Sequence, residues 1–365
     1  MECLLALFFL GSSTVTGGIG IAKQDTWFCM IIGVLLSFLL YWIYSSVIEL
    51  YPGRNYYDNI IKACGNIPGR ILVFILSFYA LLTGAFVLCD YAEFIHVVNL
   101  TGTPLLALYV CLLGAALYVL KTRIYVLARL SKFFLPVIFV CVLITVIFSM
   151  KDWNISNLKP FLNTGFSSVA GGTLVILSLP FGESVVCASL FGQLDSRVRP
   201  FPVFVKGAVL GFVPILAANL RNTFTLGYAS SLYAFPSYEA VSTIVLGEFF
   251  TRIEVLIGIV LLLTGFFKLC VFLFCCASGV AKVFGLKDYE PISAGCALFL
   301  LTATMFAVKD SQELVKIVPL IPVYSLPIQV LVPLAALITG KLRNRRKPKK
   351  QKRKLPVTVQ EPPSA

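Results

Sequence analysis

Charged side chains are scarce in this sequence. Asp, Glu, Lys and Arg together make up only 13% of its 365 residues, whereas 58% are hydrophobic. A soluble domain has roughly 25% charged residues, and a helix that crosses a membrane needs about 20 predominantly apolar residues. Apolar stretches of that kind recur from one end of the chain to the other. The sequence therefore argues against an ordinary soluble enzyme and predicts an all-α integral membrane protein.

Histidine is almost absent, and the common catalytic motifs are missing. His96 is the only histidine, and the eleven cysteines contain no Cys-x-x-Cys pair. Nearly all of the cysteines lie within apolar runs, which does not fit the disulfide framework of a small secreted domain. The chain also lacks GxSxG, HExxH and GxxxxGK[ST] motifs. Zinc, haem and histidine-based catalysis are disfavoured, so we expect no cofactor, no metal and no enzymatic activity.

The net charge of +13 comes mainly from the C-terminal end of the chain. Residues 341–365 contain ten Lys or Arg residues and one acidic residue, Glu361. A basic segment directly after an apolar stretch is attracted to anionic lipid by about 1 kcal/mol per Lys or Arg. We therefore predict that residues 341–365 form a disordered cytoplasmic tail at the membrane surface. Contact with a nucleic acid or a partner protein is the less favoured alternative.

Residues 1–340 form the predicted membrane domain. Ten apolar segments divide it: 3–22, 26–48, 69–98, 104–120, 124–149, 167–192, 200–227, 252–284, 291–308 and 317–340. The links on the side of the two termini, with the tail, hold 22 Lys or Arg residues against 7 on the opposite side. Because such residues stay in the cytoplasm, both termini are predicted there. The first segment has Glu2 where a secretory signal is basic, so we expect it to be retained.

Two of the ten segments contain sequence that a continuous helix avoids. Residues 11–18 read GSSTVTGG and contain few helix formers, and residues 178–184 read SLPFGES within an apolar run. Proline removes a backbone donor and glycine permits unwinding, so both stretches can free backbone N–H and C=O groups. Such groups persist at membrane depth only where they line a cavity or bind something. A kink relieved by neighbouring helices is the alternative for each break.

The two breaks fall in the first and the sixth segment, which begin two halves of five segments each. Because five is odd, the second half enters the membrane from the opposite side, which gives inverted repeats at about 1–150 and about 165–340. Paired interruptions of this kind indicate a transporter-type central site. Helix N-termini bind anions and unwound carbonyls bind an ammonium, which suits an amino acid. The candidate binding residues at the breaks are Gly11, Ser13, Thr14, Gly17, Gly18, Pro180, Phe181, Gly182 and Glu183.

Lys268 lies deep within the eighth apolar segment. About 13 residues flank it on either side, or roughly 20 Å of helix, so its ammonium group does not easily reach water. An uncompensated lysine there costs at least ~2.5–3.5 kcal/mol. We predict that Lys268 lies beside the central site, in the place of a coupling cation, or pairs with Glu183. A structural ion pair without a ligand role is the alternative, and Glu183 either caps freed N–H groups or holds a ligand ammonium.

Two further acidic residues lie in the third segment. Asp90 and Glu93 are predicted near its outer end, at the membrane interface rather than in a proton relay. Tyr79 and Thr264 are candidates for recognising the side chain of the ligand, together with Ser13 and Thr14 at the first break.

Five strings in order along the chain carry a family resemblance. They are YPGR at 51–54, VLARL at 126–130 with Pro136, PFGE at 180–183, GEF at 247–249 followed by RIE at 252–254, and FGLKDY at 284–289. The ordered set covers nearly the whole chain. It resembles the spore germination permease family, the B subunits of endospore germinant receptors, within the amino acid–polyamine–organocation superfamily.

This resemblance implies a LeuT-like fold whose pocket recognises a nutrient germinant, often an amino acid, in the spore inner membrane or cell membrane. It also implies two partners, an A-type membrane subunit and a C-type lipoprotein. The residues to which it assigns the pocket are Gly17, Gly18, the stretch 180–183 and Lys268. The alternative is an active amino acid permease that uses the same pocket.

Overall fold

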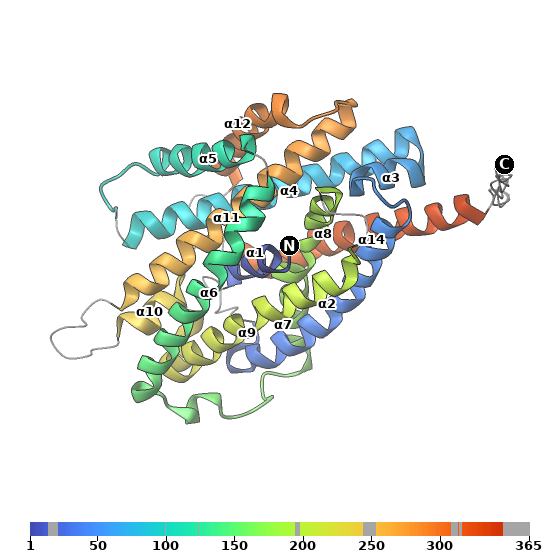
Figure 1. Cartoon of the computed structure of the whole chain (residues 1–365). Helices are drawn as coiled ribbons and strands as arrows, with labels where there is room; N and C mark the ends of the chain where they lie inside the picture. The colour runs from blue at the N-terminus through green and yellow to red at the C-terminus, as the bar shows by residue number, and fades with distance from the viewer. Residues whose placement is uncertain are drawn as a thin grey trace, which may run out of the picture.

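The computed structural model describes residues 1–13, 21–98, 100–122, 124–193, 198–243, 253–307, 313 and 316–345, which form a bundle of α-helices (Figure 1). Its first helices are α1 (Glu2–Ser13), α2 (Thr26–Glu49), α3 (Tyr56–Cys64), α4 (Asn66–Val98), α5 (Leu105–Lys121) and α6 (Ile124–Ser149). The later ones are α7 (Phe166–Ile176), α8 (Ser184–Cys187), α9 (Pro200–Leu226), α10 (Pro236–Ser242), α11 (Glu254–Phe284), α12 (Glu290–Ala307) and α14 (Ile321–Arg345).

Short irregular helical segments join or interrupt these helices. They are η1 (Lys23–Asp25), η2 (Met150–Asp152), η3 (Ile155–Leu158), η4 (Leu177–Gly182), η5 (Ala188–Gln193), η6 (Gly227–Ser231) and η7 (Val318–Leu320). Each of the ten predicted apolar segments overlaps one of the apolar helices or, for the sixth, α7 and the segments that follow it. The first segment overlaps α1 only as far as Ser13, because residues 14–20 lie outside the described residues.

Seven helical stretches in the described parts of the chain are long and apolar enough to cross a membrane. They are Lys23–Glu49, Asn66–Val98, Ile124–Asp152, Phe166–Gly192, Pro200–Ser231, Glu254–Phe284 and Val318–Arg345. Three shorter apolar helices, α1, α5 and α12, accompany them. The prediction of an all-helical membrane protein is confirmed.

The outer surface of the bundle is itself apolar. Large side chains such as Leu39 on α2, Phe74 on α4 and Phe133 on α6 are more than half exposed. Hydroxyl groups within the helices donate to carbonyl groups of their own helix, as Ser37 does to Val34. A surface of this kind loses no hydrogen bonds to water when it enters hydrocarbon, because its backbone and hydroxyl groups already have partners inside the protein.

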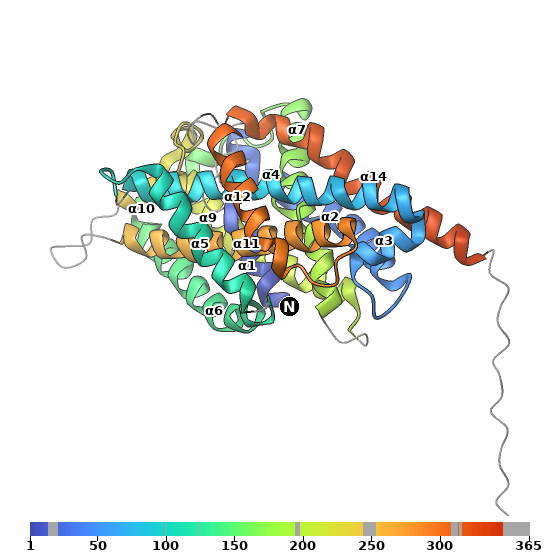
Figure 2. The ribbon, with the colours of Figure 1, turned by 90° about the horizontal axis from the view of Figure 1, so that it is seen from above.

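Helix α1 lies inside the bundle, although it is only twelve residues long. The side chains from Leu4 to Leu10 are at most 1% exposed, and α9 and α11 pack directly against the helix. Figure 2 shows α4 and α11 running side by side, and this pair forms the most extensive helix contact of the structure. Together, α1, α4 and α11 form the centre around which the candidate site is built.

Buried polar contacts hold the ends of the bundle together. The carboxylate of Asp25, which precedes α2, accepts hydrogen bonds from the backbone N–H of Leu162 at 2.9 Å and from the hydroxyl of Thr164 at 2.7 Å. The guanidinium of Arg221 on α9 is fully buried and donates to the hydroxyl of Thr145 on α6 at 2.8 Å. The first contact joins α2 to the chain before α7, and the second joins α9 to α6.

Candidate ligand-binding site

The sixth apolar segment is interrupted in its middle. Helix α7 ends at Ile176, and Leu179 within η4 has extended backbone angles of φ −137° and ψ 114°. Pro180 follows it and has no N–H to donate to a helical hydrogen bond. After η4, α8 continues for only four residues. The break predicted at residues 178–184 is confirmed.

The predicted break in the first segment falls mostly outside the described residues. Helix α1 ends at Ser13, whose side chain is not described, and Thr14, Gly17 and Gly18 lie outside the described residues. Of the candidates at this break, only Gly11 can be placed with its surroundings. A Cβ atom at Gly11 would lie 2.7 Å from Cδ of Lys268 and 3.0 Å from the carbonyl oxygen of Thr264. The end of α1 therefore touches α11 beside Lys268.

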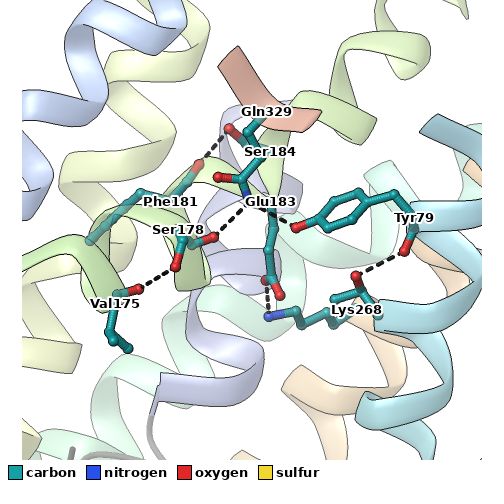
Figure 3. Close-up of polar contacts among 9 residues, drawn as sticks. Tyr79, Val175, Ser178, Phe181, Glu183, Ser184, Lys268 and Gln329 are labelled. Carbon is teal, nitrogen blue, oxygen red and sulfur yellow. Dashed lines mark hydrogen bonds and ion pairs between the residues drawn. The ribbon is translucent and has the colours of Figure 1, made fainter. Parts of the chain in front are cut away.

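A buried ion pair stands next to the sixth-segment break. The Nζ atom of Lys268 lies 2.6 Å from Oε2 of Glu183, and both side chains are almost completely buried (Figure 3). The Lys268 ammonium also lies 5.1 Å from the ring centroid of Phe8 and 5.8 Å from that of Phe272, within the range of cation–π attraction. The predicted pairing of Lys268 with Glu183 is confirmed. The ion pair offsets the free-energy cost of burying a charged lysine at this depth.

Side chains from two other helices donate hydrogen bonds to backbone carbonyl groups of η4. Gln329 on α14 donates through Nε2 to the carbonyl oxygen of Ser178 at 2.9 Å and to the hydroxyl of Tyr79 at 2.8 Å (Figure 3). The hydroxyl of Tyr44 on α2 donates to the carbonyl oxygen of Gly182 at 3.4 Å. A Cβ atom at Gly182 would overlap the side-chain amide of Gln329. Glycine is therefore required for this close approach of α14 to η4.

A small cavity of about 30 Å³ lies beside these residues. One wall is a stripe along α4 formed by Tyr79, Thr83, Phe86, Val87 and Asp90, in which successive turns of the helix each contribute one or two residues. Leu179 and Glu183 of the broken segment, with Val318, Ile321 and Tyr324, form the rest. A cavity of this volume holds about two water molecules. It is therefore a narrow space that reaches the Glu183 end of the ion pair.

Of the remaining predicted residues, only Tyr79 lines the cavity, whereas Phe181, Pro180 and Thr264 pack elsewhere. Phe181 is buried and packs on Phe9, with ring centroids 5.4 Å apart, rather than lining the cavity. Pro180 is buried beside it. The hydroxyl of Thr264 donates to the carbonyl oxygen of Val260 in its own helix, so it is not directed at the cavity residues. Tyr79 lines the cavity, and its role in ligand recognition stays a prediction.

Sequence reasoning places Asp90 wrongly and misses Gln329. Asp90 is predicted at the interface, but it is only 5% exposed and lines the internal cavity, and Glu93 is buried as well. The error arises because distance along the helix gives depth but not the face that a side chain occupies. Gln329 does leave a signal, since it is an amide between Pro327 and Pro333 in an otherwise apolar segment.

The contribution of Gln329 can be measured by truncation. We expect Gln329→Ala to lower the free energy of unfolding by about 1–3 kcal/mol, because the buried carbonyl of Ser178 loses its donor. Thermal unfolding of the detergent-solubilised chain measures this as a fall in Tm. Ser325→Ala, one turn earlier on α14, is the matched control, because its hydroxyl bonds only within its own helix. Equal unfolding temperatures for the two variants would contradict the assigned role.

The helix arrangement is that of a secondary transporter. It is similar to the structure of Mhp1, a nucleobase-cation-symport-1 family transporter solved with bromovinylhydantoin bound, with a TM-score of 0.66 at 13% sequence identity. The match covers 93% of this chain and 90% of Mhp1. The chain is thus a multi-pass membrane protein with a LeuT-like transporter fold.

The sequence then identifies the family within this class. A family model described as "Spore germination protein" matches residues 1–314, and the chain belongs to this family. It is 25% identical over 355 residues to spore germination protein KB of Bacillus subtilis, covering 95% of this chain and 94% of that protein. It is 21% identical to the putative spore germination protein YfkT of the same organism, covering 86% of each. The family predicted from the ordered strings is confirmed.

Proposed function

We propose that this chain is the ligand-sensing B subunit of a spore germinant receptor and that it binds an amino acid near the middle of the membrane. The observation that carries the proposal is the buried Lys268–Glu183 pair at the break in the sixth segment, next to a cavity. An ammonium and a carboxylate in that position can exchange their mutual contact for the two charges of a zwitterion. The carbonyl oxygens of Ser178 and Gly182 in η4, which accept hydrogen bonds from Gln329 and Tyr44, become further acceptors for the ligand ammonium when the ligand displaces these side chains.

The proposed site lies where α1, η4, α4 and α11 approach one another. Gly11 brings α1 against Lys268, Gly182 brings α14 against η4, and Tyr79 contributes a hydroxyl from α4. The proposal also includes Ser13, Thr14, Gly17 and Gly18 on the α1 side. Pro180 and Phe181 shape the break rather than touch the ligand, because both are buried away from the cavity wall.

The membrane arrangement proposed for this function has ten spans. The seven long helices and the three shorter ones, α1, α5 and α12, make up two inverted repeats of five, with a basic tail from residue 341 at the lipid surface. Both termini lie in the cytoplasm, and the protein resides in the spore inner membrane or the cell membrane. An A-type membrane subunit and a C-type lipoprotein complete the receptor.

Ligand binding to the full chain tests the proposal. The purified protein in lipid nanodiscs is heated with each of the twenty L-amino acids, and Tm is recorded. A ligand at 100 times its Kd stabilises the native state by about 2.7 kcal/mol, so we expect at least one amino acid to raise Tm by several degrees. If none of the twenty shifts Tm at saturating concentration, an amino acid is not the ligand and the proposal is wrong.

An active permease is the second candidate, because the transporter fold and the cavity serve transport as well as sensing. Uptake of the stabilising amino acid into proteoliposomes separates the two. A sensing subunit binds it without accumulating it, whereas a permease accumulates it in proportion to time.

A further inference from the structure

Asp90 differs from Glu183 and Asp25, two buried carboxylates that have partners within the protein. Glu183 pairs with Lys268, and Asp25 accepts several hydrogen bonds from the chain before α7. Asp90 is 5% exposed, yet none of the residues that the structure describes donates a hydrogen bond to its carboxylate or forms an ion pair with it. Its side chain instead lines the cavity. A carboxylate in such a position needs a cation or a water cluster opposite it.

The charges around the cavity leave an excess of negative charge. The Lys268 ammonium acts electrostatically on Asp90, and it also forms the ion pair with Glu183 at 2.6 Å. Glu93, one turn beyond Asp90 on the same helix, is also acidic and does not line the cavity. Two carboxylates, Asp90 and Glu183, therefore share the cavity wall with no basic side chain among the lining residues. The space between them favours a cation.

Asp90 and Tyr79 mark two ends of the α4 wall. They are eleven residues apart, which is about 16 Å along a helix, so this wall of the cavity runs along α4 from the level of Gln329 toward Val98. Lys268 lies close enough to the Asp90 end of the wall for its charge to act on the Asp90 carboxylate. Asp90 and the Lys268–Glu183 pair therefore belong to one group of charges beside the cavity.

We propose that Asp90 is the counter-ion for the ammonium group of an amine ligand, so that this end of the cavity selects compounds with a protonated primary amine over sugars and amine-free acids. The inference rests on the proposed function, since it names the chemical class that the same cavity admits. It assigns to Asp90 a recognition role beside the Lys268–Glu183 pair.

Charge selectivity inside the cavity can be measured without knowing the ligand. Val318 lines the same cavity, so Val318→Cys in the full chain places a thiol there. The rates of its modification by a cationic trimethylammonium methanethiosulfonate and by the anionic sulfonate reagent are followed by peptide mass, which separates the introduced thiol from the eleven native cysteines. The quantity of interest is the ratio of the cationic to the anionic rate. This ratio is compared between the Val318→Cys protein with Asp90 intact and the same protein with a second substitution at Asp90 or Glu93.

We expect Asp90→Asn to lower this ratio at least tenfold, because Asp90 and Val318 line the same small cavity. A unit charge at a separation on the order of 5 Å changes each rate severalfold, in opposite directions, even at the dielectric constant of water. Asp90→Glu keeps the charge and should keep the ratio. Glu93→Gln is the matched control on the same helix and should change it less than about twofold, because Glu93 does not line the cavity. If Asp90→Asn does not fold, Asp90→Ser removes the charge in its place.

The outcomes separate this inference from the proposed function. A ratio that is unchanged when Asp90 is neutralised overturns the ammonium site, and this includes the case in which the Asp90 carboxyl is protonated and therefore uncharged. Amino acid binding in the nanodisc assay together with an unchanged ratio leaves the proposed function intact and rejects the role of Asp90. A ratio that depends on Asp90 in a protein that no amino acid stabilises supports the cation site and rejects the amino acid as ligand.

Discussion

Replacing Lys268 with methionine is expected to destabilise this protein more than any other single change at the site. Methionine has nearly the length of the lysine stem but no charge, so the carboxylate of Glu183 remains buried without its partner. Breaking a buried pair in this way costs about 3–5 kcal/mol. We expect Lys268→Met to lower the amount of protein in the membrane severalfold, to lower the Tm of what remains and to abolish binding of the stabilising amino acid. Quantitative blotting, thermal unfolding and the nanodisc assay measure the three effects.

A double variant separates the structural role of the pair from its role in binding. Lys268→Met combined with Glu183→Gln removes both charges, and replacement of a whole buried pair is often neutral for stability. We expect the double variant to regain normal protein levels and to stay unable to bind. If it binds the amino acid as the wild type does, the pair is only structural. A single Lys268→Met variant with unchanged level and unchanged binding would contradict both roles.

The second large effect is expected for Gly182→Leu. Even one methyl group at this position would overlap Gln329 and approach the carbonyl oxygen of Leu177 to 2.8 Å, so a leucine must push α14 away from η4. Overpacking of this kind costs about 1–3 kcal/mol. If the whole cost is lost from the free energy of binding, Kd rises by roughly fivefold to 150-fold. Thermal titration of the stabilising amino acid against the variant measures this rise.

The matched control for Gly182→Leu is Gly258→Leu on α11. A Cβ atom at Gly258 meets nothing within 4 Å, so the same increase in size should leave both Tm and Kd near the wild-type values. Similar Kd values for the wild type and the Gly182 variant would show that the geometry of η4 has no part in binding.

The helices could be predicted from the sequence because the membrane leaves few alternatives. Runs of about 20 apolar residues become helices, and turn residues between them set the ends. The predicted segment 69–98 corresponds to α4 at Asn66–Val98, and 252–284 corresponds to α11 at Glu254–Phe284. Helix α1 follows the predicted segment 3–22 as far as Ser13, and residues 14–20, which include most of the predicted first break, lie outside the described residues.

Part of the site was also predictable, because an unpaired charge inside the membrane costs free energy. A charged side chain deep in an apolar segment needs a partner, and Glu183 beside a proline and a glycine was the available one. The faces of the helices were not predictable, because apolar residues surround α4 on every side and give no amphipathic signal. The sequence therefore places Asp90 at the membrane interface, whereas the structure places it at the internal cavity. The packing of Gln329 against η4 depends on a contact between α14 and the break that no local sequence pattern encodes.

The absence of a side chain at Gly11 has a mechanical consequence. Because the stem of Lys268 fills the space that a Cβ atom would take, the end of α1 has no room to move toward α11 while the lysine keeps its position. A tilt of α1 toward α11 would displace the ammonium from Glu183, and withdrawal of the ammonium would give α1 room to tilt. The contact at Gly11 thus links the position of this short buried helix to the separation of the two central charges.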